Sequence, residues 1–249
     1  MVRTPLGWPI PPPLPKSYKS KEQFKREREL MVKRLIREGF LKSRRLIEAM
    51  LKVPREEFIP ECYRDYAYYE LPFPIPGNGR NQTISCPHSY PLFYEAIELK
   101  EGDKFLEVGT GSGYGAALAR EVVGSNGLVV TIEINPVTYD FAKKNLLRLG
   151  YRDIVIILGD GSEGYSPLAP YDKIALTASC PQIPKPLIEQ LKIGGKLIAP
   201  VGKPNEIQKL TLVTKKGKDE IVMEVVDEVL YVPLIGRYGW KWLDNNLNA

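Results

Sequence analysis

Short, uninterrupted apolar runs alternate with helical patterns through the middle of the chain. The runs fall at residues 105–108, 128–132, 154–158, 173–177 and 196–201. Between them, apolar residues recur at helical intervals over 116–123, 136–149 and 184–191. Runs without polar alternation are typical of strands that are buried on both faces and connected by crossover helices. The pattern therefore predicts an α/β fold with a mainly parallel sheet and right-handed connections.

After residue 201 the pattern changes. Residues 208–214 and 221–232 are strand-like, and the turn Lys215-Lys216-Gly217-Lys218 joins them. Two such strands joined by a short glycine-containing turn form a hairpin. We expect this hairpin to close one edge of the sheet with antiparallel strands. The tail from Gly236, with Trp240 and Trp242, is expected to cover part of a site or an interface.

Helical spacing also marks the N-terminal part of the chain. Apolar residues predict an amphipathic helix over about 20–38, which Gly39 ends. Ser43 is a suitable cap for a second helix, which Pro54 stops. Residues 61–81 are irregular and rich in Pro and Gly, as functional loops often are.

A further helix is expected over residues 94–99, just before the first strand of the sheet. Pro87 favours a helix start, because proline lacks the N–H that a first turn leaves unpaired. Ser85 or Cys86 would then be the cap.

The chain opens with a proline-rich arm. Residues 4–15 are expected to be extended or disordered, with too little apolar periodicity to join a core. Removal of residues 1–15 should then leave folding intact. The predicted division of the chain is 1–19 arm, 20–81 N-terminal helices and loop, 82–235 main α/β domain and 236–249 tail.

A glycine-rich turn follows the first predicted strand. Leu106 to Gly115 reads Leu-Glu-Val-Gly-Thr-Gly-Ser-Gly-Tyr-Gly, with glycines at alternate positions. Strand, glycine turn and helix together let a backbone approach a nucleotide closely. The spacing G-x-G-x-G, in place of the dinucleotide G-x-G-x-x-G, favours S-adenosylmethionine over a nicotinamide cofactor. An ordinary strand-to-helix turn is the alternative interpretation.

Two carboxylates follow the next two predicted strands. Glu133 ends the second strand, where folds of this kind hold ribose hydroxyls. Asp160, between Gly159 and Gly161, follows the third strand and can accept a bond from an adenine amine. Taken singly, Glu133 could be a surface carboxylate and Asp160 a turn residue. Three such features in order after three strands favour a nucleoside-containing cofactor.

Composition excludes several other classes. The chain has 249 residues, 43% of them hydrophobic, and no apolar run long enough to span a bilayer. Prolines interrupt the N-terminus, which therefore lacks the apolar core of a signal peptide, so we expect a cytoplasmic protein with no membrane partner. The three cysteines, Cys62, Cys86 and Cys180, form no C-x-x-C pair, and one disulfide remains open. His88 is the single histidine, which excludes multi-histidine metal sites and makes hydrolase chemistry a poor hypothesis. No metal is expected.

Positive charge is concentrated near the N-terminus. Residues 16–45 hold 12 Lys and Arg against 4 Glu, a surplus of 8 in a chain of net charge +5. Such a segment can meet nucleic acid, or it can be the solvated face of a helix, which is the interpretation we favour.

Several motifs together resemble the protein-L-isoaspartate O-methyltransferase family. They are Val53-Pro54-Arg55-Glu56-Glu57-Phe58, Gln82-Thr83-Ile84-Ser85, the glycine turn, Gly159-Asp160-Gly161 with Gly164-Tyr165, Ala169-Pro170-Tyr171-Asp172, Leu187 to Leu191 before Gly194-Gly195, Pro200-Val201-Gly202 and Tyr231-Val232-Pro233-Leu234. The resemblance runs from about Lys42 to Leu234, and Gln-Thr-Ile-Ser is its most particular motif. The arm and the tail beyond Leu234 have no clear counterpart.

This resemblance implies a class I, Rossmann-like methyltransferase fold with added N-terminal helices. It implies methyl transfer from S-adenosylmethionine to the free carboxylate of L-isoaspartyl residues in damaged proteins and peptides, which starts their repair. It implies that Ser85 is the active-site serine. With the glycine turn, the expected cofactor residues are Thr83, Ile84, Ser85, Cys86, Glu107, Gly109, Gly111, Gly113, Glu133, Ile134, Asp160 and Gly161.

The sequence departs from the family before Thr83. The family usually has Gly-x-Gly-Gln there, whereas this chain has Gly77-Asn78-Gly79-Arg80-Asn81-Gln82, a longer loop with an extra cation. Tyr90 stands where many members have His or Met. The loop from Leu71 to Asn81 is the best candidate to grip a peptide backbone.

A carboxylate nucleophile is already ionised at neutral pH, so the expected reaction needs no general base. Ser85 could donate a hydrogen bond that orients this carboxylate, or it could only cap a helix. Two other functions stay open. One is a nucleic-acid methyltransferase anchored by the basic segment, against which stands the absence of an Asn-Pro-Pro-Tyr-type motif. The other is a cofactor-binding interaction module without catalysis, against which stands the intact Thr-Ile-Ser loop.

Overall fold

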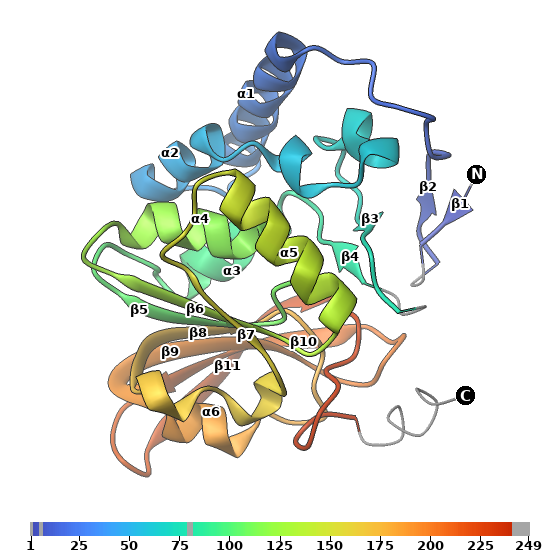
Figure 1. Ribbon diagram of the computed structural model, residues 1–249. Helices are drawn as coiled ribbons and strands as arrows, with labels where there is room; N and C mark the ends of the chain where they lie inside the picture. The colour runs from blue at the N-terminus through green and yellow to red at the C-terminus, as the bar shows by residue number, and fades with distance from the viewer. Residues whose placement is uncertain (1, 5–6, 79–81, 241–249) are drawn as a thin grey trace.

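The computed structural model of the chain describes residues 2–4, 7–78 and 82–240 (Figure 1). Gly79, Arg80 and Asn81 of the predicted substrate loop, and Trp242 of the tail, lie outside the described residues.

A seven-stranded mixed sheet forms the centre of the molecule, with strand order β11-β10-β9-β8-β5-β6-β7. The strands are β5 Lys104–Val108, β6 Leu128–Glu133, β7 Val155–Leu158, β8 Tyr171–Leu176, β9 Leu191–Val201, β10 Gln208–Lys215 and β11 Ile221–Val229. Neighbours from β7 through to β9 pair in parallel, whereas β10 pairs antiparallel with both β9 and β11. The predicted parallel sheet with an antiparallel C-terminal hairpin is confirmed.

Successive side chains of the buried strands enter two apolar cores, one on each face of the sheet. Phe105 joins the core that contains Leu118, whereas its neighbour Leu106 joins the core that contains Leu187. Both faces are covered because helices lie on each side of the sheet (Figure 1). These are α4 Tyr114–Val123 and α5 Pro136–Arg148 on one side and α6 Lys185–Glu189 on the other, with the short 3-10 turns η3 Gly161–Glu163 and η4 Ser166–Leu168 between strands.

The N-terminal helices extend the first of these cores. Helix α1, Lys21–Arg37, begins at Ser20, whose hydroxyl accepts a bond from the Gln23 amide in a capping box. Helix α2, Arg44–Lys52, packs on α4, and Ser43 is its cap residue without a side-chain capping bond. Two 3-10 turns, η1 Arg55–Phe58 and η2 Glu61–Tyr66, and a two-stranded sheet of β3 Phe73–Pro74 with β4 Thr83–Ile84 follow. The stretch expected to be irregular is therefore partly ordered.

The helix before the sheet begins and ends earlier than predicted. Helix α3 spans Ser89–Ala96, and its N-cap is His88, which makes no side-chain capping bond. Pro87 lies in a turn ahead of the helix, so Ser85 and Cys86 are not caps. The capping interpretation of Ser85 is wrong.

The proline-rich arm is extended and packs against the body, so of the two expected states the disordered one is wrong. That its removal leaves folding intact stays a prediction, which this packing argues against. Its strands β1 Val2–Arg3 and β2 Pro9–Ile10 form a small antiparallel hairpin. Ile10 is 1% exposed and belongs to the main core. Asp65 accepts bonds from the Ser17 hydroxyl and from two backbone amides of residues 18–19. The buried Ile10 and the hydrogen bonds to Asp65 therefore attach the arm to the body, although the arm has no apolar periodicity.

Cys62, Cys86 and Cys180 are free thiols, so the disulfide left open by the sequence does not form. In the part of the chain that the structure describes, no helix has both the length and the apolar character that crossing a bilayer requires.

Candidate functional site

The glycine turn holds its shape through backbone conformations that favour glycine. Gly109, Gly111 and Gly113 have φ values of 98°, 57° and 86°, in the region that side chains disfavour. A Cβ on Gly109 would collide with the Thr177 hydroxyl, and one on Gly113 would press on Leu146. The backbone can therefore pass close to the strand ends, and α4 starts directly after Gly113.

A cavity of about 90 Å³, here named the Glu133 cavity, opens at the carboxyl ends of β5, β6 and β8. This is the edge of a parallel sheet where ligands generally bind. Of the predicted cofactor residues, those that line it are Thr83, Gly109, Gly111, Glu133, Ile134 and Gly161. Other residues that line it are Gln82, Val108, Ile132, Thr177, Ala178, Val232, Pro233, Leu234 and Ile235.

Glu133 is held in place before any ligand binds. Its carboxylate accepts one bond from the Gly111 amide and one from the Asn135 amide, each 3.0 Å long and each on a different oxygen. Burial raises the pKa of Glu133, and the backbone donors oppose that shift. A carboxylate has about four lone-pair positions, so Glu133 keeps acceptor capacity at the cavity wall beyond these backbone bonds.

Asp160 lies beside this cavity and is not among its described lining residues. One carboxylate oxygen accepts bonds from the Ser162 amide at 2.8 Å and its hydroxyl at 2.7 Å. The other accepts from the Arg237 amide at 2.7 Å. The predicted bond from an adenine amine is thus limited to the remaining lone pair of that second oxygen.

Glu107 lies beneath the glycine turn and is 1% exposed. Its carboxyl accepts a 2.7 Å bond from the Thr131 hydroxyl, and Gly115 leaves the room that it occupies. Burial raises the pKa of Glu107 to about 8. Glu107 therefore packs under the glycine turn. Neither Glu107 nor Gly113 is among the described residues that line the Glu133 cavity.

A second cavity, of about 430 Å³ and here named the Ser85 cavity, adjoins the first. Thr83, Thr177 and Val232 line both cavities. Ser85 and Cys86, which the sequence assigned to the cofactor, line this second cavity, whereas Ile84 is 1% exposed in the apolar core. The Thr-Ile-Ser strand thus forms part of the boundary between the two cavities.

Arg55 fixes the loop that carries Ser85. Its side chain has no exposed surface and donates bonds to the carbonyls of Ala67 at 2.7 Å and Ser85 at 2.6 Å. The guanidinium also lies over the rings of Tyr90 and Tyr114, 5.8 and 5.3 Å from their centroids. Charge-assisted bonds to two carbonyls are strong in a buried site. The sequence analysis names Arg55 only as part of a family motif, without this role.

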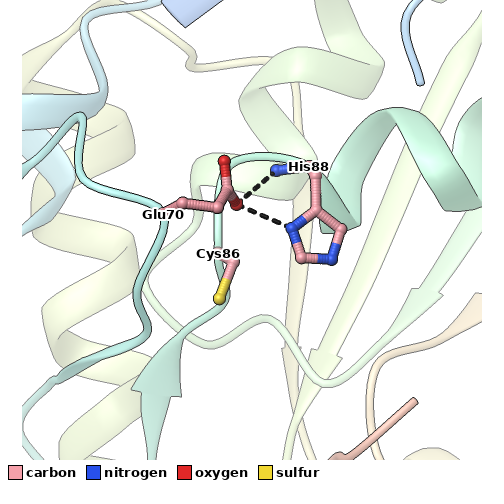
Figure 2. A group of neighbouring side chains, drawn as sticks. All are labelled: Glu70, Cys86 and His88. Atoms are coloured by element: carbon pink, nitrogen blue, oxygen red, sulfur yellow. Dashed lines mark hydrogen bonds and ion pairs between the residues drawn. The ribbon is translucent and has the colours of Figure 1, made fainter. Parts of the chain in front are cut away.

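Glu70, Cys86 and His88 form a cluster on the wall of the Ser85 cavity (Figure 2). Glu70 accepts bonds from the amide and the Nδ1 of His88 at 3.0 and 2.6 Å, and it pairs with Arg34. Burial alone would raise the pKa of Glu70, but the bonds from His88 and the charge of Arg34 lower it. Burial, and then the charge of Glu70, raises the pKa of the Cys86 thiol to about 12.

This cluster has the residue types of a metal site, and its ligand atoms lie within 4.8 Å of one another. A cation there would have to displace the His88–Glu70 bond and deprotonate a thiol that burial keeps neutral. The contacts instead tie α1, through Arg34, to the loop of Ser85.

Sequence reasoning missed Thr177 and residues 232–235, which line the Glu133 cavity. Thr177 directly follows β8, and its hydroxyl donates to the carbonyl of Gly109 at 2.7 Å. The chain after β11 returns across the same strand ends, where the Ser179 amide donates to Val232 and the Leu234 amide to Ser179. The position of Thr177 after a parallel strand was the one signal that could have found it.

Comparisons with known proteins agree on one family. The family model for protein-L-isoaspartate(D-aspartate) O-methyltransferase matches residues 25–239, which extends the resemblance beyond Leu234. The protein-L-isoaspartate O-methyltransferase of Methanococcus aeolicus is 51% identical over 85% of this chain and 95% of its own. Protein-L-isoaspartate O-methyltransferase 1 of Archaeoglobus fulgidus is 45% identical over 89% and 99%.

Solved structures give the same result. A protein-L-isoaspartate O-methyltransferase superposes with a TM-score of 0.79 at 32% identity, over 89% of this chain and 69% of that chain. A putative family member from Plasmodium falciparum, in complex with S-adenosyl-L-homocysteine, superposes with a TM-score of 0.73 at 26% identity, over 84% and 98%.

Proposed function

The chain belongs to the protein-L-isoaspartate O-methyltransferase family, whose members methylate isoaspartyl residues with S-adenosylmethionine as donor. We propose which residues of this chain bind the donor and which bind the substrate. In this proposal the Glu133 cavity holds the donor and the Ser85 cavity receives the isoaspartyl carboxylate. The main support for this proposal is that the two cavities meet at Thr83, Thr177 and Val232, with Ser85 beside the boundary.

The Glu133 cavity suits the nucleoside part of the donor by its chemistry. Glu133 offers acceptor capacity to a pair of hydroxyls, and the buried Oε1 atom of Gln82 has no hydrogen-bond partner among the described residues. At about 90 Å³ the cavity is smaller than pockets for molecules of this size. Binding therefore requires the Gln82 side chain, which lines the cavity, to move outward.

When bound, the donor supplies a methyl group carried on a positively charged sulfur. The residues of the chain have to hold the attacking carboxylate in line with that methyl and keep water away. The carboxylate is ionised at neutral pH, so no general base is required. The Ser85 hydroxyl can donate one bond to it, and a neutral donor leaves the carboxylate more nucleophilic than a cation would.

Ser85 is well placed for this role. Arg55 fixes its carbonyl, and the half-buried Tyr231 lines the same cavity. Its neighbours in the cavity wall include apolar side chains such as Leu92 and Leu230, which limit the access of water.

The basic segment gives little support to a nucleic-acid methyltransferase. Several of its cations are paired within the protein: Arg28 with Glu56 at 2.9 Å, Lys19 with Glu27 at 2.5 Å, and Arg34 with Glu70. Paired cations contribute less to phosphate binding. A salt-sensitive affinity of the full chain for RNA or DNA would favour the alternative.

The decisive experiment measures labelled methyl transfer from S-adenosylmethionine to paired peptides that contain isoaspartate or aspartate at one position. We expect methylation of the isoaspartyl peptide and little or none of its isomer. The isomers share charge and composition, so only geometry can discriminate between them. Equal methylation of both peptides would reject the proposal.

Ser85→Ala tests the orienting bond. Loss of one such bond should lower turnover on the isoaspartyl peptide by roughly tenfold to a hundredfold, with donor affinity nearly unchanged. Ser166→Ala, at an exposed position in η4, is the matched control. Full activity of Ser85→Ala would leave the reaction in place and remove the proposed role of Ser85.

A further inference from the structure

We propose that the N-terminal arm supplies one wall of the peptide site through Trp8, and that this wall selects a Lys or Arg side chain next to the isoaspartyl residue. The inference rests on the proposed use of the Ser85 cavity. It concerns a segment outside residues 25–239, to which the family model is confined.

The arm holds Trp8 in a fixed position. The Trp8 amide donates to the Thr4 hydroxyl at 3.0 Å, and its carbonyl accepts from the Thr4 amide at 2.8 Å. Two residues later, Ile10 is buried in the core. Further along, the Leu14 amide donates to the carbonyl of Cys62 at 2.8 Å. The indole is thus carried on backbone that is anchored on both sides.

Trp8 lines the same cavity as Ser85 and is nevertheless 45% exposed. A tryptophan whose backbone is already anchored at the wall of a binding cavity loses only side-chain freedom when a ligand covers it. Trp is accordingly enriched among residues that dominate binding energy. The peptide that brings its carboxylate to Ser85 is therefore the ligand expected to cover Trp8.

The charges of the wall decide which side chain fits. Asp227 and Glu228, at the end of β11, also line the cavity and are exposed. Neither has an ion-pair partner in the described part of the chain, whereas the third carboxylate of the wall, Glu70, is paired with Arg34. No Lys or Arg is found among the described residues that line the cavity. The wall is thus net negative.

A cavity lined by both an indole and uncompensated carboxylates suits a cation on an apolar stem. The stem of Lys or Arg can lie on the ring, and the charge gains from both the ring face and the carboxylates. An acidic side chain at the same position would be repelled. A neutral apolar side chain would gain only the contact with the ring.

The test uses one isoaspartyl host peptide in which the residues on either side of isoaspartate are, in turn, Lys, Leu or Glu. For the full-length protein we expect kcat/KM to fall in the order Lys, Leu, Glu, by roughly tenfold or more between the extremes at low salt. The advantage of Lys should shrink as ionic strength rises. Equal methylation of the three peptides would overturn the inference and leave the reaction standing, whereas methylation of none would reject the proposed function itself.

Variants distinguish the contribution of the Trp8 ring from that of the carboxylates. Trp8→Ala should raise KM for the Lys peptide roughly threefold to thirtyfold with little change in kcat, and Trp8→Phe should restore part of the loss. Glu228→Gln should reduce the preference for Lys over Glu and leave that for Leu over Glu less affected. Tyr18→Ala, an exposed arm aromatic outside this cavity, is the matched control and should match wild type.

Donor affinity, measured by calorimetry with S-adenosylhomocysteine, should be the same in all variants. If Trp8→Ala lowers the melting temperature strongly, Glu228→Gln decides in its place. An unchanged charge preference in Glu228→Gln would refute the proposal.

Discussion

At the scale of single residues, two buried carboxylates one strand apart perform different tasks. Glu133 presents free lone pairs to a cavity, whereas Glu107 faces the underside of the glycine turn. Burial raises the pKa of both carboxyls; backbone donors oppose the shift at Glu133, whereas the pKa of Glu107 reaches about 8.

Glu133→Ala should weaken binding of S-adenosylhomocysteine by about 1.5–3 kcal/mol, because the variant lacks the acceptor for two ribose hydroxyls. Glu133→Gln retains one acceptor oxygen and should lose less. Isothermal calorimetry measures both, with a melting curve as the control for folding. Unchanged affinity in the Ala variant would remove the ribose role.

Glu107 should make stability depend on pH. Its pKa is about 8 in the folded protein, above its ordinary value of 4.5, so the folded state binds the proton more tightly. Its contribution is therefore favourable at low pH and is lost as pH rises from about 4.5 to 8. Relative to Glu107→Gln, which stays neutral, wild type should lose free energy of unfolding across this range, on the order of a few kcal/mol. Denaturant titrations at pH 5 and pH 8 check this; a constant difference would contradict it.

At the scale of elements, the arm shows how a segment without periodicity can still be structural. Ile10→Ala should lower the free energy of unfolding by about 2–4 kcal/mol, because it opens a cavity where the arm meets the core. Ile10→Val should cost about 1 kcal/mol. Urea titrations measure both changes. An Ile10→Ala protein as stable as wild type would return the arm to the status of a dispensable appendage.

The central strands of the sheet could be predicted because they are apolar runs buried on both faces, as at β5 and β6. The docking of the arm could not, since it depends on the single apolar residue Ile10 and on the polar contacts of Asp65. Among the site residues, Glu133 was found because the end of a parallel strand is a recurrent ligand position. Residues 232–235 were missed because only the tertiary fold brings the chain after β11 back to those strand ends.

At the scale of the whole molecule, the C-terminal segment completes the cofactor side of the site. The amides of Arg237 and Tyr238 donate to Asp160 and to the Ser162 hydroxyl, and the Trp240 indole donates to the carbonyl of Ser179. These bonds hold residues 232–235 against the Glu133 cavity.

A chain ended after Ile235 should therefore bind S-adenosylhomocysteine more weakly and lose about 1–3 kcal/mol of stability. Arg237→Ala is the control, since it keeps the backbone donor and removes only two side-chain contacts, the ion pair with Glu163 at 3.4 Å and the contact with the Tyr238 ring at 5.7 Å. Calorimetry and melting curves together test this. Wild-type affinity in the shortened chain would show that residues 232–235 keep their position without the bonds made by residues 237–240.

His88 is the single imidazole in 249 residues, and it lies in the wall of the Ser85 cavity. A preparation labelled only at histidine would consequently give one set of ring signals in a nuclear magnetic resonance spectrum, with no assignment problem. Nδ1 of that ring is hydrogen-bonded to Glu70, which in turn pairs with Arg34 of α1. One resonance would thus report both the arrival of a peptide in the cavity and any movement of the first helix that accompanies it.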